Sequence, residues 1–265
     1  SGNYTSITFE PDLSKFGLGG SSAAVQAALQ GSIAMMKRRV VDTAACCGTQ
    51  KDRVQVHLNG QVVPVDGFES YVKLFQQKPT AVEPTTTKTT TAAAAASTEV
   101  ASISNPIIYT RVNDRCEVAV MCAPSGSFEQ QSFVNSVWTP RGGSHVSTVS
   151  SQITSAIEEA VSKAGKTSTS HMIRNRVMIF VRASVENPQF DSQAKDALAT
   201  SSSQFSQWMN LPATYLRKIV QNSGIVDEVI ADLDARERSR LVRATSNKSA
   251  GKRVDVPKLE DAHLA

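Results

Sequence analysis

The chain has 265 residues, of which 40% are hydrophobic, so it can bury the core of one large domain or two small ones. No segment approaches the roughly 20 consecutive apolar residues of a membrane-spanning helix, and the polar N-terminal residues do not resemble a signal peptide. We therefore expect a soluble, intracellular protein without a membrane partner. The net charge is +4, but residues 236–258 alone carry +6, so any attraction to nucleic acid is expected to be local.

The first 78 residues are predicted to form a strand, a helix, a hairpin and a second helix. Polar and apolar residues alternate in residues 4–9, which predicts the strand, and apolar residues recur at helical spacing in residues 33–45. The pair Asn59-Gly60 separates two alternating segments, as is typical of a hairpin with a two-residue type I′ turn. The second helix is predicted by four residues at helical spacing: Phe68, Tyr71, Val72 and Phe75.

Residues 79–104 interrupt this pattern with runs of threonine and alanine, with prolines, and with almost no large apolar side chain. Such a segment cannot bury enough apolar surface to offset the entropy that is lost on ordering. It is predicted to be a linker or a loop insertion, and it marks a domain boundary.

The second half of the chain opens with two predicted strands, at residues 116–122 and 131–138, which are separated by a turn at residues 124–126. A helix capped by Ser144 is predicted to follow, and Gly165 is predicted to end it. The apolar stripe of this helix consists of Val146, Val149, Ile153, Ile157 and Val161.

Residues 176–185 are apolar enough to form an interior strand. Two further helices are predicted, one near residues 212–222 and one that begins at Val226. The last helix is expected to carry ion pairs between residues four positions apart: Asp232 with Arg236, and Asp234 with Arg238. The mixture of strands and helices favours an α/β (α+β) fold with two layers.

Several catalytic and metal-binding motifs can be tested and excluded. The GKT sequence at residues 165–167 lacks the first glycine of a P-loop and follows a predicted helix instead of a strand. Ser192 and Lys195 fit the SxxK pattern of penicillin-recognising enzymes, but no SDN or KTG element accompanies them. The four histidines are scattered, and the four cysteines contain no CxxC pair, so we expect reduced, buried thiols and no metal site.

A series of short motifs resembles one family. Residues 186–195 combine an asparagine-proline turn, a phenylalanine and a glutamine-x-lysine triplet directly after the predicted interior strand. The other motifs are residues 8–16, 36–39, 58–60 with 67–68, 132–136 (SFVNS), 142–146 (GGSHV) and 256–262 (VPKLEDA). In this order they resemble the type IIA DNA topoisomerases of the eukaryotic kind.

The resemblance implies four parts. These are the C-terminal part of a GHKL-type ATPase domain (1–78), the linker or insertion (79–104), a ribosomal-protein-S5-like transducer domain (105–245) and a link toward the DNA-cleavage core (246–265). In the family such a segment belongs to an ATP-hydrolysing isomerase that acts as a homodimer on double-stranded DNA and couples ATP binding and hydrolysis to strand passage. The rest of the ATP site, the Mg²⁺ site and the DNA-cleaving tyrosine belong to other regions of the family, so we expect this segment alone to be inactive.

The resemblance also implies that Gln193, Ala194 and Lys195 contact ATP, with Lys195 as the catalytic residue at the γ-phosphate. The family has threonine where this chain has Ala194, so one hydroxyl is missing. A lysine ammonium and a glutamine amide supply suitable donors for a phosphate. Because side chains two positions apart diverge on a helix, Gln193 and Lys195 are expected to converge only if the loop is extended.

Four basic residues are candidates for contact with DNA. The segment that follows the helix ending at Gly165 resembles the DNA-facing lysine loop of the family, here thinned to Lys163 and Lys166. Arg174 and Arg176 flank the interior strand near this loop, where phosphate contact and ordinary surface charge are equally good explanations.

Two alternatives stay open at this level. The chain could be the second domain of a MutL-like mismatch-repair ATPase, although residues 256–262 argue against it, or a nucleic-acid-binding module of S5-like fold without a nucleotide role. The latter predicts that Gln193 and Lys195 are dispensable while the basic loop and tail are needed. For a topoisomerase we expect the nucleus, or alternatively a mitochondrion or another DNA-containing organelle.

Overall fold

The computed structural model describes residues 4–47, 54–76 and 106–249. The predicted linker at residues 79–104 and the motif at residues 256–262 lie outside the described residues. The division of the chain into domains therefore stays a prediction.

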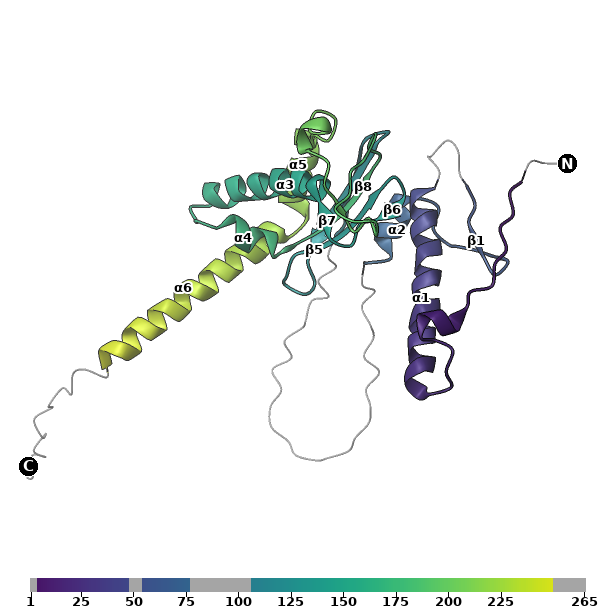
Figure 1. Ribbon diagram of the computed structural model, residues 1–265. Helices are drawn as coiled ribbons and strands as arrows, with labels where there is room; N and C mark the ends of the chain where they lie inside the picture. Colours follow the sequence, from purple (N-terminus) through teal and green to yellow (C-terminus); the bar gives the residue numbers. More distant parts are fainter. Residues whose placement is uncertain (1–3, 48–53, 77–105, 250–265) are drawn as a thin grey trace, which may run out of the picture.

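A five-stranded mixed sheet forms the centre of the molecule, with strand order β3-β4-β8-β5-β6 (Figure 1). The strands are β3 (Ile108–Asn113), β4 (Cys116–Cys122), β5 (Glu129–Val134), β6 (Val137–Trp138) and β8 (Val177–Ala183). β8 pairs antiparallel with β4 and parallel with β5, and the remaining pairs are antiparallel. The predictions for β4 and β8 are confirmed, and every residue of β4 is buried, as expected of a strand covered on both faces.

The predicted strand at residues 131–138 is wrong in one respect, because it is a hairpin and not a single strand. Asn135 and Ser136 both have positive φ angles, 50° and 65°, and form a two-residue turn between β5 and β6. β3 was not predicted at all, because its residues are only partly buried and its polar side chains blur the alternation.

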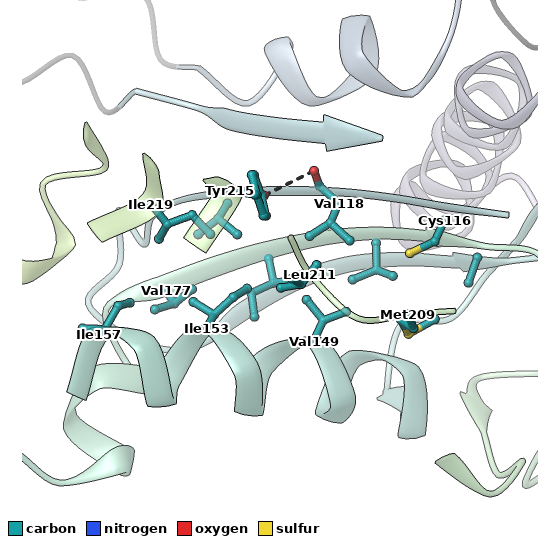
Figure 2. Packing of buried hydrophobic residues seen from close by; sticks show 14 of the residues in the cluster. Cys116, Val118, Val149, Ile153, Ile157, Val177, Met209, Leu211, Tyr215 and Ile219 are labelled. Atoms are coloured by element: carbon teal, nitrogen blue, oxygen red, sulfur yellow. Dashed lines mark hydrogen bonds between the residues drawn. The ribbon is translucent and has the colours of Figure 1, made fainter. Parts of the chain in front are cut away.

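One face of the sheet packs on three helices, α3 (Ser144–Lys163), α5 (Ala213–Asn222) and α6 (Ile225–Ser249). The predicted stripe of α3, with Val149, Ile153 and Ile157 fully buried, lies against the inward side chains of β4 and β8 (Figure 2). The hydroxyl group of Tyr215 donates a hydrogen bond to the carbonyl group of Ile108 (2.9 Å), which fastens α5 to the edge strand. These two layers are the ones predicted for residues 105–245.

The other face of the sheet packs on the N-terminal part of the chain. This part contains a 3-10 helix (Leu13–Phe16), α1 (Ala23–Cys46), the hairpin of β1 (His57–Leu58) and β2 (Gln61–Val62), and α2 (Phe68–Lys73). Aromatic rings join α2 to the sheet, since the rings of Tyr71 and Phe133 are 5.6 Å apart and edge-on. Arg38 of α1 lies 4.4 Å from the ring centre of Trp138 and donates to Gln131 (2.9 Å). The N-terminal part therefore adds a third layer to the two that were predicted.

The hairpin and the helix after it are confirmed. Asn59 and Gly60 have φ angles of 51° and 80°, the positive values that a type I′ turn requires. The predicted strand at residues 4–9 is wrong: this segment has no strand structure, and Tyr4, Ile7 and Phe9 are each at least 80% exposed. Alternation alone does not make a strand when no neighbouring strand is present to accept its hydrogen bonds.

Of the two predicted end residues of α3, Ser144 and Gly165, only the second is confirmed. Ser144 is the first residue of α3 and does not cap it, because Gly143 holds the cap position. Gly165, with a φ angle of 75°, ends α3 as predicted, and the amide groups of Gly165 and Lys166 donate to the carbonyl groups of Ser162 and Val161. None of the helices in the described ranges has the length and apolarity needed to cross a bilayer.

Candidate functional site

The segment that carries Gln193, Ala194 and Lys195 is a closed loop, residues 191–197, which we call the 191–197 loop. Its two ends meet where Phe190 and Leu198 form an isolated antiparallel bridge. Inside that bridge, the amide group of Asp191 donates to the carbonyl group of Ala197 (3.2 Å). The loop is thus held at its neck by backbone hydrogen bonds.

A second strand pair anchors the same neck to α3. β7 (Gly142–Gly143) pairs parallel with β9 (Ala197–Leu198), so the residues before α3 lie directly beside the end of the loop. A Cβ atom on Gly143 would come within 2.4 Å of the backbone nitrogen and oxygen of Leu198. Only glycine permits this approach, which explains the position of the Gly142-Gly143 pair.

The tip of the loop is a turn and not an extended segment. The amide group of Lys195 donates to the carbonyl group of Ser192 (3.0 Å), which closes a four-residue turn with Gln193 and Ala194 at its centre. Lys195 itself has a φ angle of 60°, in the left-handed region. The extended segment that convergence of Gln193 and Lys195 requires is therefore not present in this structure, because the closed neck leaves too few residues to span the tip without a turn.

Lys195, unlike Lys163, Lys166 and Arg176, has no ion pair with a described residue. Its ammonium group lies 5.8 Å from the ring centre of Phe190, and among the described residues no carboxylate lies within ion-pair distance of it. The loop thus presents an exposed, uncompensated positive charge on a backbone that is fixed at both ends. Such a group is available to a phosphate at no cost of breaking an existing ion pair.

The strand that leads to this loop is also fastened. Asn135, at the end of β5, exchanges two hydrogen bonds of 2.9 Å with the backbone of Val185 through its side-chain amide. Asn187 has a φ angle of 48° and begins the predicted asparagine-proline turn, which is thereby confirmed. The asparagine of the SFVN motif therefore serves to direct the chain from β8 toward the 191–197 loop.

His145, in the GGSH motif, is completely buried at the start of α3. Its Nε2 atom lies 3.4 Å from Thr139 Oγ1, and its Nδ1 atom has no hydrogen-bond partner among the described residues. Burial lowers the pKa of His145 to about 3, so the folded protein holds a neutral imidazole at pH 7.

We expect acid to destabilise the protein through His145. An unfolded chain binds a proton at this histidine below about pH 6.5, whereas the folded chain does so only near pH 3, so stability falls as the pH drops through this window. The free energy of unfolding should decrease by about 1.4 kcal/mol per pH unit from this residue. Urea unfolding at several pH values checks this, with His145→Asn flattening the pH dependence and the exposed-site variant His57→Asn leaving it unchanged. Equal pH dependence of wild type and His145→Asn would contradict it.

The lysine loop lies at the C-terminal end of α3, whereas the 191–197 loop lies beside its N-terminal end, and Lys163 and Lys166 are paired with acids. Lys163 pairs with Glu159 within α3 (2.7 Å). Lys166 pairs with Asp234 (2.5 Å) and with Glu237 (3.4 Å), both on α6. The hydrogen bonds and negative charges of these carboxylates raise the pKa of Lys166, and Asp234 has the largest effect.

The two candidate arginines have different environments. Arg176 pairs with Asp232 and, at 3.5 Å, with Glu228, again on α6. Arg174, at the end of the short helix α4 (Ser170–Arg174), lies 4.3 Å from the ring centre of Phe128 and is exposed. The structure therefore brings Lys166 and Arg176 together on one acidic face of α6 and leaves Arg174 apart from them.

Two predicted ion pairs on α6 are wrong, since the carboxylates of Asp232 and Asp234 turn toward Arg176 and Lys166 and not toward Arg236 and Arg238. Spacing four residues apart could not reveal these longer-range partners. Between α4, α6 and the lysine loop lies a cavity of about 900 Å³. Its charged lining residues include Lys166, Arg176, Arg236, Arg240, Asp232 and Glu237.

Sequence reasoning also missed Arg141 and Asp191, which form an ion pair of 2.7 Å beside the neck of the loop. The only sequence signal was their nearness to the GGSH and glutamine-x-lysine motifs. The four cysteines are free thiols as predicted, three of them buried, and burial raises the pKa of Cys46 and Cys116 to about 12. Within the described ranges, no group of three or more histidine, cysteine or acidic side chains could hold a metal ion.

A mixed sheet covered on both faces, with a lysine-bearing loop tied beside the start of α3, agrees with the class that the motifs indicated. The chain belongs to the DNA gyrase B family, whose model matches residues 67–249, more than half of its length. This confirms the resemblance to type IIA topoisomerases.

The particular relatives are eukaryotic. The chain is 37% identical over 265 residues to DNA topoisomerase 2 of Arabidopsis thaliana and 32% identical over 264 residues to that of Saccharomyces cerevisiae. These alignments cover 98% and 99% of this chain but only 16% and 17% of the relatives, so the chain spans about one sixth of their length.

Solved structures give the same result. The ATPase and transducer domains of DNA topoisomerase II from Balamuthia mandrillaris match with a TM-score of 0.62 and 31% identity, over 78% of this chain and 45% of that one. The ATPase region of Saccharomyces cerevisiae topoisomerase II matches with a TM-score of 0.60 and 30% identity, over 83% and 48% of the two chains. The expected mixed α/β fold is therefore confirmed.

Proposed function

We propose that this chain is the segment of an ATP-dependent type IIA DNA topoisomerase that senses the γ-phosphate of ATP and couples ATP binding and hydrolysis to DNA strand passage. In this role Lys195 is the catalytic residue, and Gln193 and Ala194 lie with it at the nucleotide. The ATP would be held mainly by regions outside this chain, together with Mg²⁺, for which the described residues offer no ligand group.

The observation that carries the proposal is that Lys195 presents to solvent a positive charge that no described residue pairs with, on a loop with a closed neck. It is exposed, it has no carboxylate partner among the described residues, and it stands on a loop whose neck is closed by β7 and β9. A charge-assisted hydrogen bond from such a group contributes about 1.5–3 kcal/mol. Because this bond requires the γ-phosphate, it can shift an equilibrium between two domain arrangements by about one to two decades.

The turn at residues 192–195 limits how the two polar side chains act. Gln193 is central in the turn and Lys195 ends it, so they do not share one extended face. Lys195 therefore supplies the main contact, and Gln193 joins it if the turn opens when the phosphate binds. In either conformation the ammonium group stabilises negative charge on the transferring phosphoryl group.

The experiment that tests this function is strand passage by the full-length protein. Supercoiled DNA incubated with the protein should relax only when ATP is supplied, and a non-hydrolysable ATP analogue should support far less turnover. Relaxation that is independent of ATP would overturn the coupling role. A plain nucleic-acid-binding module would not relax DNA with or without ATP. The ion pairs of Lys163, Lys166 and Arg176 with carboxylates do not favour that alternative.

We further propose that DNA contacts the surface formed by Lys163, Lys166, Arg174 and Arg176. Four carboxylates of α6 and one of α3 compensate three of these cations, so phosphates must compete with them. Lys163 and its partner are both largely exposed, and such a pair contributes little, so Lys163 is readily released to DNA. Arg174 needs no release from an ion pair among the described residues.

Removal of an α6 carboxylate should therefore strengthen DNA binding. Asp234→Asn removes the charge of the nearer of the two carboxylates that pair with Lys166, and it is expected to tighten binding to a short duplex about threefold at low salt, with the difference fading as salt rises. Asp227→Asn removes the same charge from an exposed position at the start of α6 and serves as the matched control. Equal affinities of the two variants would remove Lys166 from the DNA contact surface.

The homodimer, the double-stranded DNA substrate and the nuclear location, or alternatively a mitochondrial or other organellar one, also belong to this proposal. The similarity to DNA topoisomerase 2 supports the homodimer and the DNA substrate, whereas the location rests on the sequence resemblance alone.

A further inference from the structure

The 191–197 loop has a second fastening besides its backbone neck. The carboxylate of Asp191 accepts two hydrogen bonds, one at Oδ2 from the guanidinium group of Arg141 (2.7 Å) and one at Oδ1 from the amide group of Ala197 (3.2 Å). The amide group of Arg141 in turn donates to the carbonyl group of Asp196 (3.0 Å). Arg141 therefore holds the first residue of the loop with its side chain and the penultimate one with its backbone.

This arrangement isolates the tip of the loop. Between Asp191 and Asp196 lie only residues 192–195, in which a backbone hydrogen bond joins the amide group of Lys195 to the carbonyl group of Ser192. Both ends of the tip that carries Lys195 are thus held from outside it, through Arg141 and Asp191. Arg141 immediately precedes β7, so the fastening also joins the loop to the start of α3.

The ion pair is too exposed to matter much for global stability. The side chain of Arg141 is 68% exposed and that of Asp191 is 29% exposed, and surface ion pairs of this kind contribute little to unfolding equilibria. Its effect is expected on the position of the loop, where an error of about 1 Å at a reacting group can lower a rate by about 100-fold.

We propose that Arg141 and Asp191 are positioning residues that hold Lys195 toward the γ-phosphate. The inference rests on the proposed function of Lys195. Without the Arg141–Asp191 pair the neck remains closed by its backbone bonds, but the tip can rotate, and the lysine samples orientations that do not reach the phosphate. The loss is therefore smaller than the loss of Lys195 itself.

The test uses the full-length protein and measures kcat and KM for ATP together with the unfolding midpoint. Arg141→Ala and Asp191→Ala are each expected to lower kcat about 10-fold, with KM and the midpoint close to wild type. The double variant should lose no more than Asp191→Ala alone, because Arg141→Ala breaks only the ion pair that the two residues share, whereas Asp191→Ala also removes the hydrogen bond from Ala197. Arg141→Lys, which retains the charge, should recover part of the rate.

Two comparisons separate this inference from simpler explanations. Arg115→Ala breaks the ion pair between Arg115 and Glu186 (2.6 Å), which is similarly exposed but lies away from the neck, and kcat should not change. In a protein that already carries Lys195→Ala, Arg141→Ala should not lower kcat further, because the lysine that Arg141 positions is absent. An additional 10-fold loss in that background would overturn the positioning role.

The outcomes also separate this inference from the function on which it rests. If Lys195→Ala lowers turnover and Arg141→Ala does not, the positioning role fails and the sensor role stands. If Lys195→Ala leaves turnover unchanged, the sensor role fails, and the positioning role fails with it.

Discussion

Replacement of Lys195 by alanine in the full-length protein is expected to lower ATP turnover by about 10- to 100-fold. One charge-assisted hydrogen bond to the transferring phosphoryl group contributes about 1.5–3 kcal/mol, and each 1.4 kcal/mol corresponds to about one decade in rate. The side chain is exposed and has no ion pair among the described residues, so folding should be unaffected. Steady-state ATP hydrolysis, measured with and without DNA, gives the result directly.

Two controls sharpen the experiment on Lys195. Lys195→Met retains most of the length of the side chain but not its charge, and it should be as inactive as the alanine variant if charge is the cause. Lys218→Ala removes an exposed lysine of α5, far along the chain from the loop, and should turn over ATP like wild type. Wild-type turnover in both Lys195 variants would leave this segment as a connector or a DNA-contacting module.

Gly143→Ala is expected to be the most damaging single substitution at the neck of the loop. Gly143 has a φ angle of 125°, which side-chain-bearing residues rarely adopt, at a cost of about 1–3 kcal/mol. The added Cβ atom would also lie 2.4 Å from the backbone of Leu198, so β7 and β9 must separate. We expect a loss of about 3–4 kcal/mol in the free energy of unfolding, and a loss of ATP turnover at least as large as that of Lys195→Ala.

Gly165→Ala is the matched control for Gly143→Ala. Gly165 also has a positive φ angle, 75°, but a Cβ atom there would meet no atom within 4 Å. Its substitution should cost only about 1–2 kcal/mol, from backbone strain alone. Urea unfolding of the two variants separates strain from collision. Equal losses would mean that the chain relaxes at Gly143 and that β7 and β9 do not fix the loop.

Much of the fold was predictable because its signals are local. Helical spacing predicted α2 and α3, a continuous apolar segment predicted β8, and the Asn59-Gly60 pair predicted a hairpin. Local signals failed where a tertiary partner decides the outcome. Residues 4–9 alternate like a strand but pair with no strand in the described part of the chain. The Asn135-Ser136 turn divides a segment that looks continuous in the sequence.

The residues of the candidate site could be predicted from the sequence, but their arrangement could not. The sequence motifs located Gln193, Ala194 and Lys195, because the triplet is contiguous and its order is specific. The conformation of the loop could not be predicted, because it depends on β7, which lies about fifty residues earlier in the chain. Arg141 and Asp191 are fifty residues apart, and only the pairing of β7 with β9 brings them to 2.7 Å.

The family, the lysine on the 191–197 loop and the mixed α/β class could all be predicted from residue types and their order along the chain. Which positive charges are free of ion pairs could be seen only in the folded chain. Carboxylates of α6 compensate Lys166 and Arg176, while Lys195 keeps its charge uncompensated among the described residues. The physical reason is that the strength of an ion pair depends on distance in space, and residues separated by 56 and 68 positions meet only after the sheet and α6 have packed.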